Sequence, residues 1–231
     1  MQINILELIE GAKQARGLTV IIDVFRAFSM ECYLYDKGVA SIYPVGDIKE
    51  AYRLKEEDAS RILVGERGGK ICEGFDYGNS PSQIKEADFA GKTVIHTTSA
   101  GTQGIANATQ AKEIITGSLV NAKAVARYIK SLAADEVSLV CMGNGGVVRA
   151  NEDVLCAEYI QSLLTEKSFD IKGKILSLRQ DGGEHFFQPY TQEVFPQEDF
   201  FLCTRYDIFP FVLKVKTDDY GKKIVVKEDI M

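Results

Sequence analysis

Short apolar runs alternate with amphipathic segments along the chain between about residues 18 and 165. The run at residues 18–24 is rich in β-branched side chains, which is typical of a buried strand, and residues 27–37 then show a helical period that ends at Gly38. The same order recurs, with expected strands at residues 41–45, 61–65, 92–96, 113–116 and 136–142. Strands that alternate with helices predict a three-layer α/β/α fold with a largely parallel or mixed sheet.

Helix start signals separate several of these strands. Asp47, followed three residues later by Glu50, has the signature of a capping box, and helices are also expected at residues 104–111 and 121–133. Asn151 is a candidate cap for a later helix that carries two acids in its first turn. Residues 68–81 are glycine-rich and have no apolar period, so a long loop is expected there.

The periodic pattern weakens after about residue 168. Phenylalanines lie there among Gln, Pro and Asp, and only residues 223–227 have the composition of a strand. We therefore expect a single domain over residues 1–231, with a core at about 18–165 and an irregular C-terminal extension at about 168–231. Three roles are open to the Phe-rich extension: packing on the core, closing over a pocket, or forming the interface of a homo-oligomer.

Composition excludes several classes of protein. The chain of 231 residues is 45% hydrophobic and 26% charged, which is ordinary for a globular protein, and its net charge of −6 argues against a nucleic-acid surface. Five cysteines without a C-x-x-C pair indicate reduced thiols in a cytoplasmic protein. The N-terminus is acidic, and no apolar run approaches the ~20 residues of a membrane span, so neither secretion nor membrane insertion is expected.

Polar residues cluster where the predicted strands end. Ligands of open α/β sheets bind just outside the carboxyl ends of the strands, so these clusters are expected to form one site. Asp23 closes the first strand, where a carboxylate needs water, a donor or a metal. Arg26 follows at the first turn of the next helix, a suitable place to bind an anion together with backbone N–H groups. The alternative is a buried ion pair between Asp23 and Arg26.

Glu66 and Arg67 repeat the pairing of acid and arginine at a second strand end, and Gly68 and Gly69 follow them. Two carboxylates from separate strands suit Mg²⁺, which takes one or two protein carboxylates and completes its coordination with water and substrate oxygens. The alternative is a turn that merely carries charges.

A hydroxyl-rich loop lies at the junction of a strand and a helix, and it consists of Thr97, Thr98, Ser99, Ala100, Gly101 and Thr102. Hydroxyl and N–H groups at a helix N-terminus are the usual components of a phosphate site. A helix cap needs only one hydroxyl, so the surplus favours ligand binding over capping alone. The chain has no P-loop and no dinucleotide fingerprint, so nucleotide cofactors are not indicated.

Further candidates follow the strand at residues 136–142. Asn144 and Gly145 are expected to contact the ligand. Glu152 and Asp153 are candidates for metal binding or base catalysis, and a favourable interaction with the helix dipole is the alternative.

The two histidines and Cys141 are interpreted differently. Neither His96 nor His185 has the i, i+4 partner of a zinc-binding helix, so both are interpreted as incidental. Cys141 has no nearby basic residue in the sequence and is expected in the core.

Six motifs occur along the chain in a fixed order: Asp23–Ala27, Gly65–Gly69, Gly74–Pro81, Thr97–Thr102, Gly117–Asn121 and Asn151–Asp153. Together they resemble the motifs of the 2-phosphosulfolactate phosphatase family. The resemblance runs from about residue 18 to 160 and continues weakly to Asp207. It implies an α/β fold and Mg²⁺-dependent hydrolysis of 2-phosphosulfolactate to sulfolactate and phosphate, as in coenzyme M biosynthesis.

The resemblance also assigns roles to the matching residues. We expect Mg²⁺ at Asp23, Glu66 and Asp153. Asp23, Arg26, Glu66 and Arg67 are the expected catalytic residues, and the substrate is expected at Arg26, Arg67, Asn79, Ser80, the 97–102 loop and Glu152. Asn144 and Gly145, which the resemblance does not cover, are added as expected substrate contacts from their position after the strand. A small phosphorylated anion, most simply the phosphate ester of a 2-hydroxy acid, is therefore the expected partner. The alternatives are a non-catalytic binding protein for such an anion and a purely structural oligomer subunit.

Overall fold

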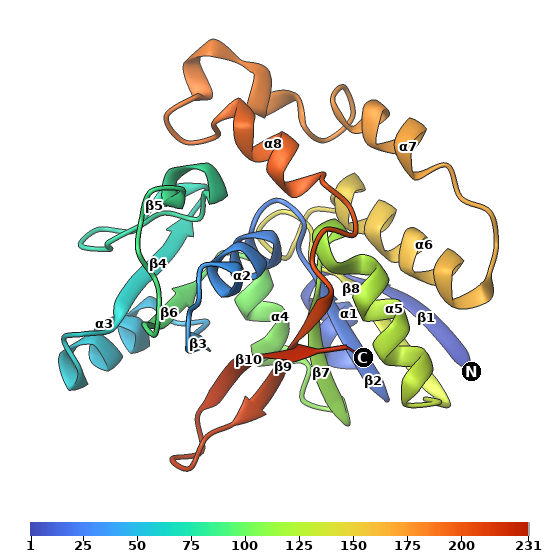
Figure 1. Ribbon diagram of the computed structural model, residues 1–231, viewed down its shortest axis with the longest axis horizontal. Coiled ribbons are helices and arrows are strands. Elements are labelled where there is room, and N and C mark those ends of the chain that lie inside the picture. Colours follow the sequence, from blue (N-terminus) through green and yellow to red (C-terminus); the bar gives the residue numbers. More distant parts are fainter. Residues whose placement is uncertain (231) are drawn as a thin grey trace.

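The computed structural model describes residues 1–230 and shows a single mixed sheet with helices on both faces (Figure 1). The strands in this part of the chain are β1 (Gln2–Glu7), β2 (Leu18–Ile22), β3 (Ser41–Pro44), β4 (Ile62–Arg67), β5 (Lys70–Ile71), β6 (Thr93–Thr97), β7 (Glu113–Gly117), β8 (Glu136–Cys141), β9 (Phe211–Thr217) and β10 (Lys223–Asp229). The α-helices are α1 (Leu8–Gln14), α2 (Ala27–Asp36), α3 (Ile48–Glu57), α4 (Gly101–Asn107), α5 (Ala122–Ser131), α6 (Asn151–Thr165), α7 (Ile171–Leu178) and α8 (Gln197–Cys203). The predicted three-layer α/β fold is confirmed.

The sheet consists of two parallel blocks joined by a hairpin. Its strand order is β1-β8-β2-β7-β9-β10-β3-β6-β4-β5. Strands β1, β8, β2 and β7 run parallel in one block, and β3, β6 and β4 run parallel in the other. The hairpin of β9 and β10 pairs antiparallel to β7 on one side and to β3 on the other. The C-terminal residues therefore join the two halves of the sheet.

Strand β2 shows how the sequence places the core. Val20 and Ile22 are fully buried in a cluster that contains side chains of α5 and α6. Ile21 points to the opposite face, where it packs in a second cluster with side chains of α2 and α4. Side chains alternate along a strand, so a strand that is covered on both faces needs an uninterrupted apolar run. This is the pattern that predicts a buried strand at residues 18–24.

Each predicted strand and helix is present, with a shift at α4. This helix spans residues 101–107 rather than the predicted 104–111. A Cβ atom at Gly104 would lie 2.4 Å from the sulfur of Met142, and one at Gly101 would lie 2.9 Å from the Cβ of Ala27. The two glycines therefore lie inside the helix because they let it pack closely on the sheet, although glycine usually marks helix ends.

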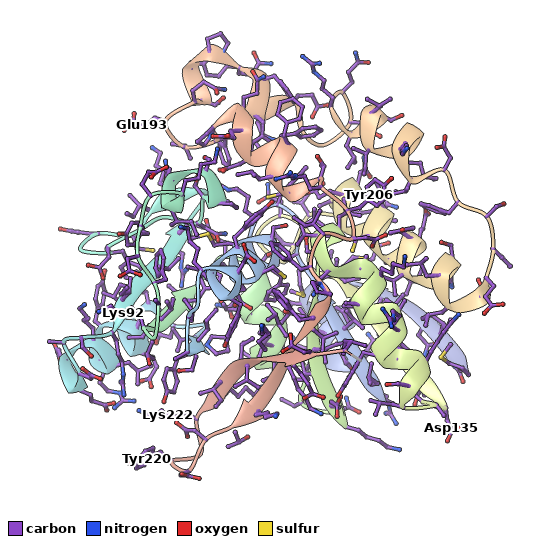
Figure 2. All side chains as sticks on the ribbon, viewed as in Figure 1. Lys92, Asp135, Glu193, Tyr206, Tyr220 and Lys222 are labelled. Atoms are coloured by element: carbon purple, nitrogen blue, oxygen red, sulfur yellow. The ribbon has the colours of Figure 1, made fainter. Side chains whose placement is uncertain are left out.

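Several elements were not predicted. Strand β1 pairs with β8 at the edge of the sheet, and most of its side chains are only half-buried, so its apolar pattern is weak. The C-terminal part is also more regular than predicted, because it contains α7, α8 and β9 in addition to β10, which matches the strand predicted at residues 223–227. In Figure 2, Tyr220 marks the tip of this hairpin, and Glu193 lies on the outer loop that precedes α8.

All five cysteines are free and buried, as expected of reduced thiols. Cys141 lies in the core, as predicted. Among residues 1–230, no helix is both long enough and apolar enough to cross a membrane.

Candidate active site

A cleft of about 520 Å³ lies where strands from both blocks of the sheet end. It brings together most of the predicted strand-end clusters. Its lining residues are Asp23, Phe25, Arg26, Glu66, Gly68, Gly69, Asn79, Ser99, Ala100, Gly143, Asn144, Gly145, Val148, Arg149, Ala150, Asn151, Glu152, Asp153, Gly182, His185 and Phe195. The expectation that distant strand ends form a shared pocket is therefore confirmed.

Asp23 and Asp153 are held by the backbone at the inner end of the cleft. Asp23 follows β2, and its Oδ1 accepts a 3.2 Å hydrogen bond from the N–H of Ala27 at the start of α2. Asp153, in the first turn of α6, accepts 2.8 Å bonds at both carboxylate oxygens, from the N–H groups of Val24 and Gly143. Asp153 therefore ties the loop after β2 to the loop after β8.

Glu66 connects two loops in the other block of the sheet, as Asp153 does in the first. Its Oε1 accepts a 2.6 Å bond from the N–H of Ser99, and its Oε2 accepts a 2.6 Å bond from the N–H of Gly69. The hydroxyl of Ser99 also donates to Oε2 at 3.2 Å. This carboxylate therefore fixes the turn after β4 against the loop after β6.

The acids of the cleft raise one another's pKa. Burial raises the pKa of Asp23 and of Asp153 well above the usual range, and the negative charge of a neighbouring acid adds to it: Asp153 for Asp23, and Glu152 for Asp153. Burial, followed by the charge of Asp23, raises the pKa of Glu152 to about 7. Oε2 of Glu152 is buried and has no hydrogen-bond partner among residues 1–230. Ionisation of these buried acids is therefore unfavourable unless a positive charge is added to the cleft.

Arg26 does not neutralise these acids, because its partner is elsewhere. Its Nη1 donates to Oδ2 of Asp199 at 2.7 Å and to the carbonyl oxygen of Val194 at 2.9 Å, and both charged side chains are buried. Its guanidinium lies over the ring of Phe195, 4.9 Å from the ring centre. The suggested Asp23–Arg26 pair is therefore wrong: Arg26 forms a buried ion pair with Asp199 of α8.

Arg67 lies outside the lining of the cleft. It donates to the carbonyl oxygens of Glu66 and Gly46 at 2.6 and 3.1 Å, and to the hydroxyl of Thr97 at 2.8 Å. These bonds hold the end of β4 against the end of β6. A direct role of Arg67 or Thr97 in phosphate binding stays a prediction.

The hydroxyl-rich loop divides between the cleft and its support. Thr98 and Thr102 bond to each other, since each backbone N–H donates to the other's hydroxyl, at 3.0 and 3.2 Å. Ser99 and Ala100 line the cleft, whereas Thr98, Gly101 and Thr102 do not. The surplus of hydroxyls is therefore mostly explained by local structure.

Of the Asn79–Ser80 pair, only Asn79 lines the cleft. The hydroxyl of Ser80 lies 3.2 Å from that of Ser82. Asn144, Gly145 and Glu152 line the cleft as predicted, and their binding roles stay predictions.

Sequence reasoning missed the C-terminal wall of the cleft. Gly182, His185 and Phe195 line it, and the ring of His185 packs edge-on against Phe195 with centres 4.6 Å apart. The interpretation of His185 as incidental is not supported by its position, and burial followed by the charge of Arg26 lowers its pKa. Of the three roles open to the Phe-rich extension, packing on the core is confirmed, because Phe186 and Phe200 are buried in the core cluster, and residues of the extension also line the pocket. No local sequence signal marks these residues, although the dense phenylalanines mark the region.

The residues of the cleft fit a divalent cation in charge and ligand type. Among residues 1–230, no group of three or more His, Cys, Asp or Glu side chains is already arranged around a metal position. Mg²⁺, however, needs only one or two protein carboxylates, and it prefers oxygen ligands. The unpartnered Oε2 of Glu152 and the raised pKa of Asp23 are both features that a bound cation would relieve.

An α/β fold that gathers acids, a buried arginine and helix N-termini at the carboxyl ends of its strands has the features of a phosphoric monoester hydrolase. Comparison with known proteins agrees and is more specific. The family model for 2-phosphosulpholactate phosphatase matches residues 3–218, and the chain belongs to this family.

Individual relatives support the assignment. A probable 2-phosphosulfolactate phosphatase of Caldicellulosiruptor saccharolyticus is 42% identical over 163 residues, which cover 69% of this chain and 67% of the relative. A probable 2-phosphosulfolactate phosphatase of Bacillus subtilis is 31% identical over 211 residues, which cover 87% of this chain and 88% of the relative.

Proposed function

We propose that the protein hydrolyses the phosphate ester of 2-phosphosulfolactate, giving sulfolactate and phosphate, and that it requires Mg²⁺. The family supports the reaction and the substrate. The observation that carries the metal requirement is the group of buried acids, Asp23, Glu152 and Asp153, which no basic side chain of the cleft neutralises. Buried charges are costly unless they are paired or bind a metal.

Asp23 and Glu152 are the best ligands for Mg²⁺ in this proposal. Oε2 of Glu152 has no partner in the part of the chain that the structure describes, whereas both oxygens of Glu66 and of Asp153 already accept backbone N–H groups. Glu66 and Asp153, the other predicted ligands, would then act mainly by holding the loops in place. When bound, Mg²⁺ supplies positive charge that stabilises the phosphoryl oxygens in the transition state.

The remaining polar groups of the cleft are suited to an anionic substrate. Ala150 and Asn151, at the N-terminus of α6, line the cleft, and the N–H groups of a helix N-terminus favour phosphate. Asn79 and Asn144 offer neutral donors for the carboxylate and sulfonate groups. Arg26 also lines the cleft and adds positive charge, and its guanidinium is held in place by Asp199.

The aromatic side chains that line the cleft help to exclude water from it. Phe25, His185 and Phe195 line the cleft, and Phe25 and His185 both pack on Phe186, with ring centres 4.9 and 4.3 Å apart. Electrostatic interactions with a transition state are stronger where bulk water is excluded.

A substrate panel tests the proposal directly. We expect release of phosphate from 2-phosphosulfolactate, slower release from phospholactate, and loss of activity after chelation that added Mg²⁺ restores. Binding of the ester without turnover, with or without Mg²⁺, would instead support the non-catalytic alternative. Turnover that is insensitive to chelation would refute the metal requirement and leave the phosphatase assignment intact.

The cellular setting is part of the same proposal. The five buried free thiols support a cytoplasmic location, and the family resemblance supports a role in coenzyme M biosynthesis or a related pathway. A homo-oligomer is also proposed, and light scattering tests it.

A further inference from the structure

A buried polar chain runs from helix α2 to the cleft through His96. This side chain projects from β6 and is fully buried. Its Nδ1 lies 2.8 Å from Oε1 of Glu31, which is also fully buried, and its Nε2 lies 3.3 Å from Oδ1 of Asn79. Asn79 lines the cleft and is only 4% exposed. Three residues from three different segments therefore form one connected chain that ends at the substrate pocket.

The Asn79 amide has one orientation in this chain, with its oxygen facing Nε2 of His96. An amide oxygen only accepts hydrogen bonds, so Nε2 of His96 is the donor in this contact. The NH₂ group of Asn79, with no protein partner within residues 1–230, is left for the cleft.

Packing alone does not explain this arrangement. A buried acid and a buried histidine cost free energy that an apolar pair of similar volume would avoid. Oε2 of Glu31 is buried and has no partner within the described residues 1–230, which adds to the cost. Such costs persist at functional sites, where a buried polar network imposes one particular geometry.

We propose that Glu31 and His96 are positioning residues that hold the Asn79 amide with its N–H donors toward an anionic oxygen of the substrate. This inference rests on the proposed function, because it concerns how the same cleft binds its ester. Glu31 and His96 act through Asn79 and do not touch the substrate. Their effect therefore falls mainly on substrate binding.

A double-mutant cycle tests the positioning role. Asn79→Ala is expected to raise KM for 2-phosphosulfolactate about tenfold, since a hydrogen bond to a charged group is lost. His96→Leu removes the donor to Oδ1 and is expected to have a similar effect, whereas His96→Gln, which retains an N–H donor, is expected to restore part of the affinity. In the Asn79→Ala background, His96→Leu is expected to change KM by less than about twofold.

The same cycle is measured on binding alone, as the dissociation constant of inorganic phosphate determined by calorimetry, which does not require turnover. Tyr35→Phe is the matched control, because Tyr35 lies one turn after Glu31 on α2 and its hydroxyl donates to the carbonyl oxygen of Val225, away from the cleft. Its KM is expected to equal that of the wild type. Glu31→Gln, which changes little in size, replaces His96→Leu if thermal melting shows that the latter unfolds.

The outcomes separate this inference from the proposed function. Additive effects of His96→Leu and Asn79→Ala on KM, or a wild-type KM in both His96→Leu and Glu31→Gln, would overturn the positioning role while the phosphatase assignment stands. Failure of the wild-type protein to hydrolyse any phosphate ester would overturn the proposed function. In that case the cycle on phosphate binding still decides whether His96 orients Asn79.

Discussion

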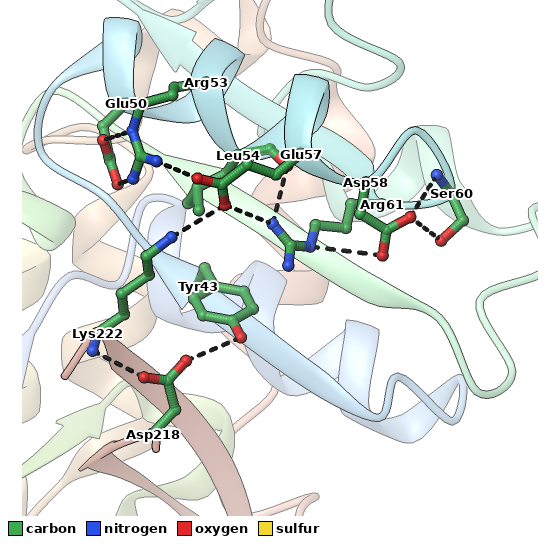
Figure 3. Close-up of polar contacts among 10 residues, drawn as sticks. All are labelled: Tyr43, Glu50, Arg53, Leu54, Glu57, Asp58, Ser60, Arg61, Asp218 and Lys222. Carbon is green, nitrogen blue, oxygen red and sulfur yellow. Dashed lines mark hydrogen bonds and ion pairs between the residues drawn. The ribbon is translucent and has the colours of Figure 1, made fainter. Parts of the chain in front are cut away.

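The acids of helix α3 and the acids of the cleft differ in the direction in which their surroundings shift their pKa values. On α3, Glu50 and Glu57 pair with Arg53, and Glu57 also pairs with Lys222 of the central hairpin (Figure 3). Hydrogen bonds from these cations lower the pKa of both glutamates. In the cleft, burial and neighbouring acids raise the pKa of Asp23 and of Glu152.

The difference lies in what surrounds each acid. The α3 network also includes Arg61, which approaches Glu57 and Asp58 at 3.6 and 3.7 Å, so acids and bases are interleaved on an exposed surface. The cleft has its acids on the inside, and its buried arginine is already paired with Asp199. Exposed pairs add little to stability, whereas buried charges without partners are costly. The cleft acids are therefore the ones expected to bind a cation.

Among the variants that test this difference, Asp23→Asn is expected to have the largest effect. Removal of this carboxylate should lower kcat/KM for 2-phosphosulfolactate by about 10³-fold, as for loss of a group that stabilises charge in the transition state. Steady-state kinetics at saturating Mg²⁺ measures the effect. The control is Glu57→Gln on α3, which should keep wild-type activity, and wild-type turnover in Asp23→Asn would contradict the assignment.

Asp199→Asn is expected to have the next largest effect. It leaves Arg26 buried with its charge unpaired, which should lower the free energy of unfolding by about 3 kcal/mol and raise KM. Chemical denaturation and kinetics measure the two effects. Glu198→Gln is the control, because the neighbouring acid is half exposed and pairs with Lys85. Equal stability of the two variants would show that Arg26 is not held by this pair.

Glu152→Gln is expected to stabilise the metal-free protein at alkaline pH. Burial raises the folded-state pKa of Glu152 to about 7, above its ordinary value of 4.5, so its contribution to stability is present below the unfolded pKa and is lost as the pH rises through 7. At pH 8 the variant should be more stable than the wild type by about 3 kcal/mol, and at pH 4 the gap should close.

Thermal melts across this pH range, with and without Mg²⁺, measure the gap between the two proteins. Mg²⁺ should narrow it at pH 8 by stabilising the wild type more than Glu152→Gln. A gap that is constant with pH would show that the Glu152 carboxyl is not perturbed by the cleft.

Among these variants, Glu57→Gln should have the smallest effect on stability. Its carboxylate is solvent-exposed, and screened surface pairs contribute little. Its melting temperature should fall slightly at low ionic strength and match that of the wild type in high salt. A large fall that persists in high salt would show that the α3 network, and not the buried pairs, holds the hairpin in place.

The sequence predicted the strand ends well because their signals are local. An apolar run that stops at Asp23 or Glu66 is visible without any other part of the chain, and both strand ends lie at the cleft although the two blocks run in opposite directions. The partner of Arg26 could not be predicted in this way. Asp199 lies 173 residues further along the chain, in a segment without apolar periodicity, and only the folded backbone brings it within 2.7 Å.

For the hydroxyl-rich loop, the sequence favoured ligand binding too strongly. A run of Thr and Ser residues at a helix start is compatible both with a ligand and with local capping, because the same hydroxyls serve both. The reciprocal bonds of Thr98 and Thr102 show that capping accounts for much of the run. His96 is a further case: its strand position is evident from sequence, whereas its contact with Asn79 depends on a loop without a regular pattern.

The central hairpin has a consequence for how the protein is made. Its strands occupy residues 211–229, yet they lie between the two parallel blocks of the sheet. During synthesis both blocks leave the ribosome before the strands that connect them, so the sheet cannot be completed until this late segment emerges. Long-range strand pairing of this kind is slow, and the exposed edges of β7 and β3 are prone to aggregation meanwhile. We therefore expect a nascent chain that is stalled before residue 211 to expose the edges of β7 and β3.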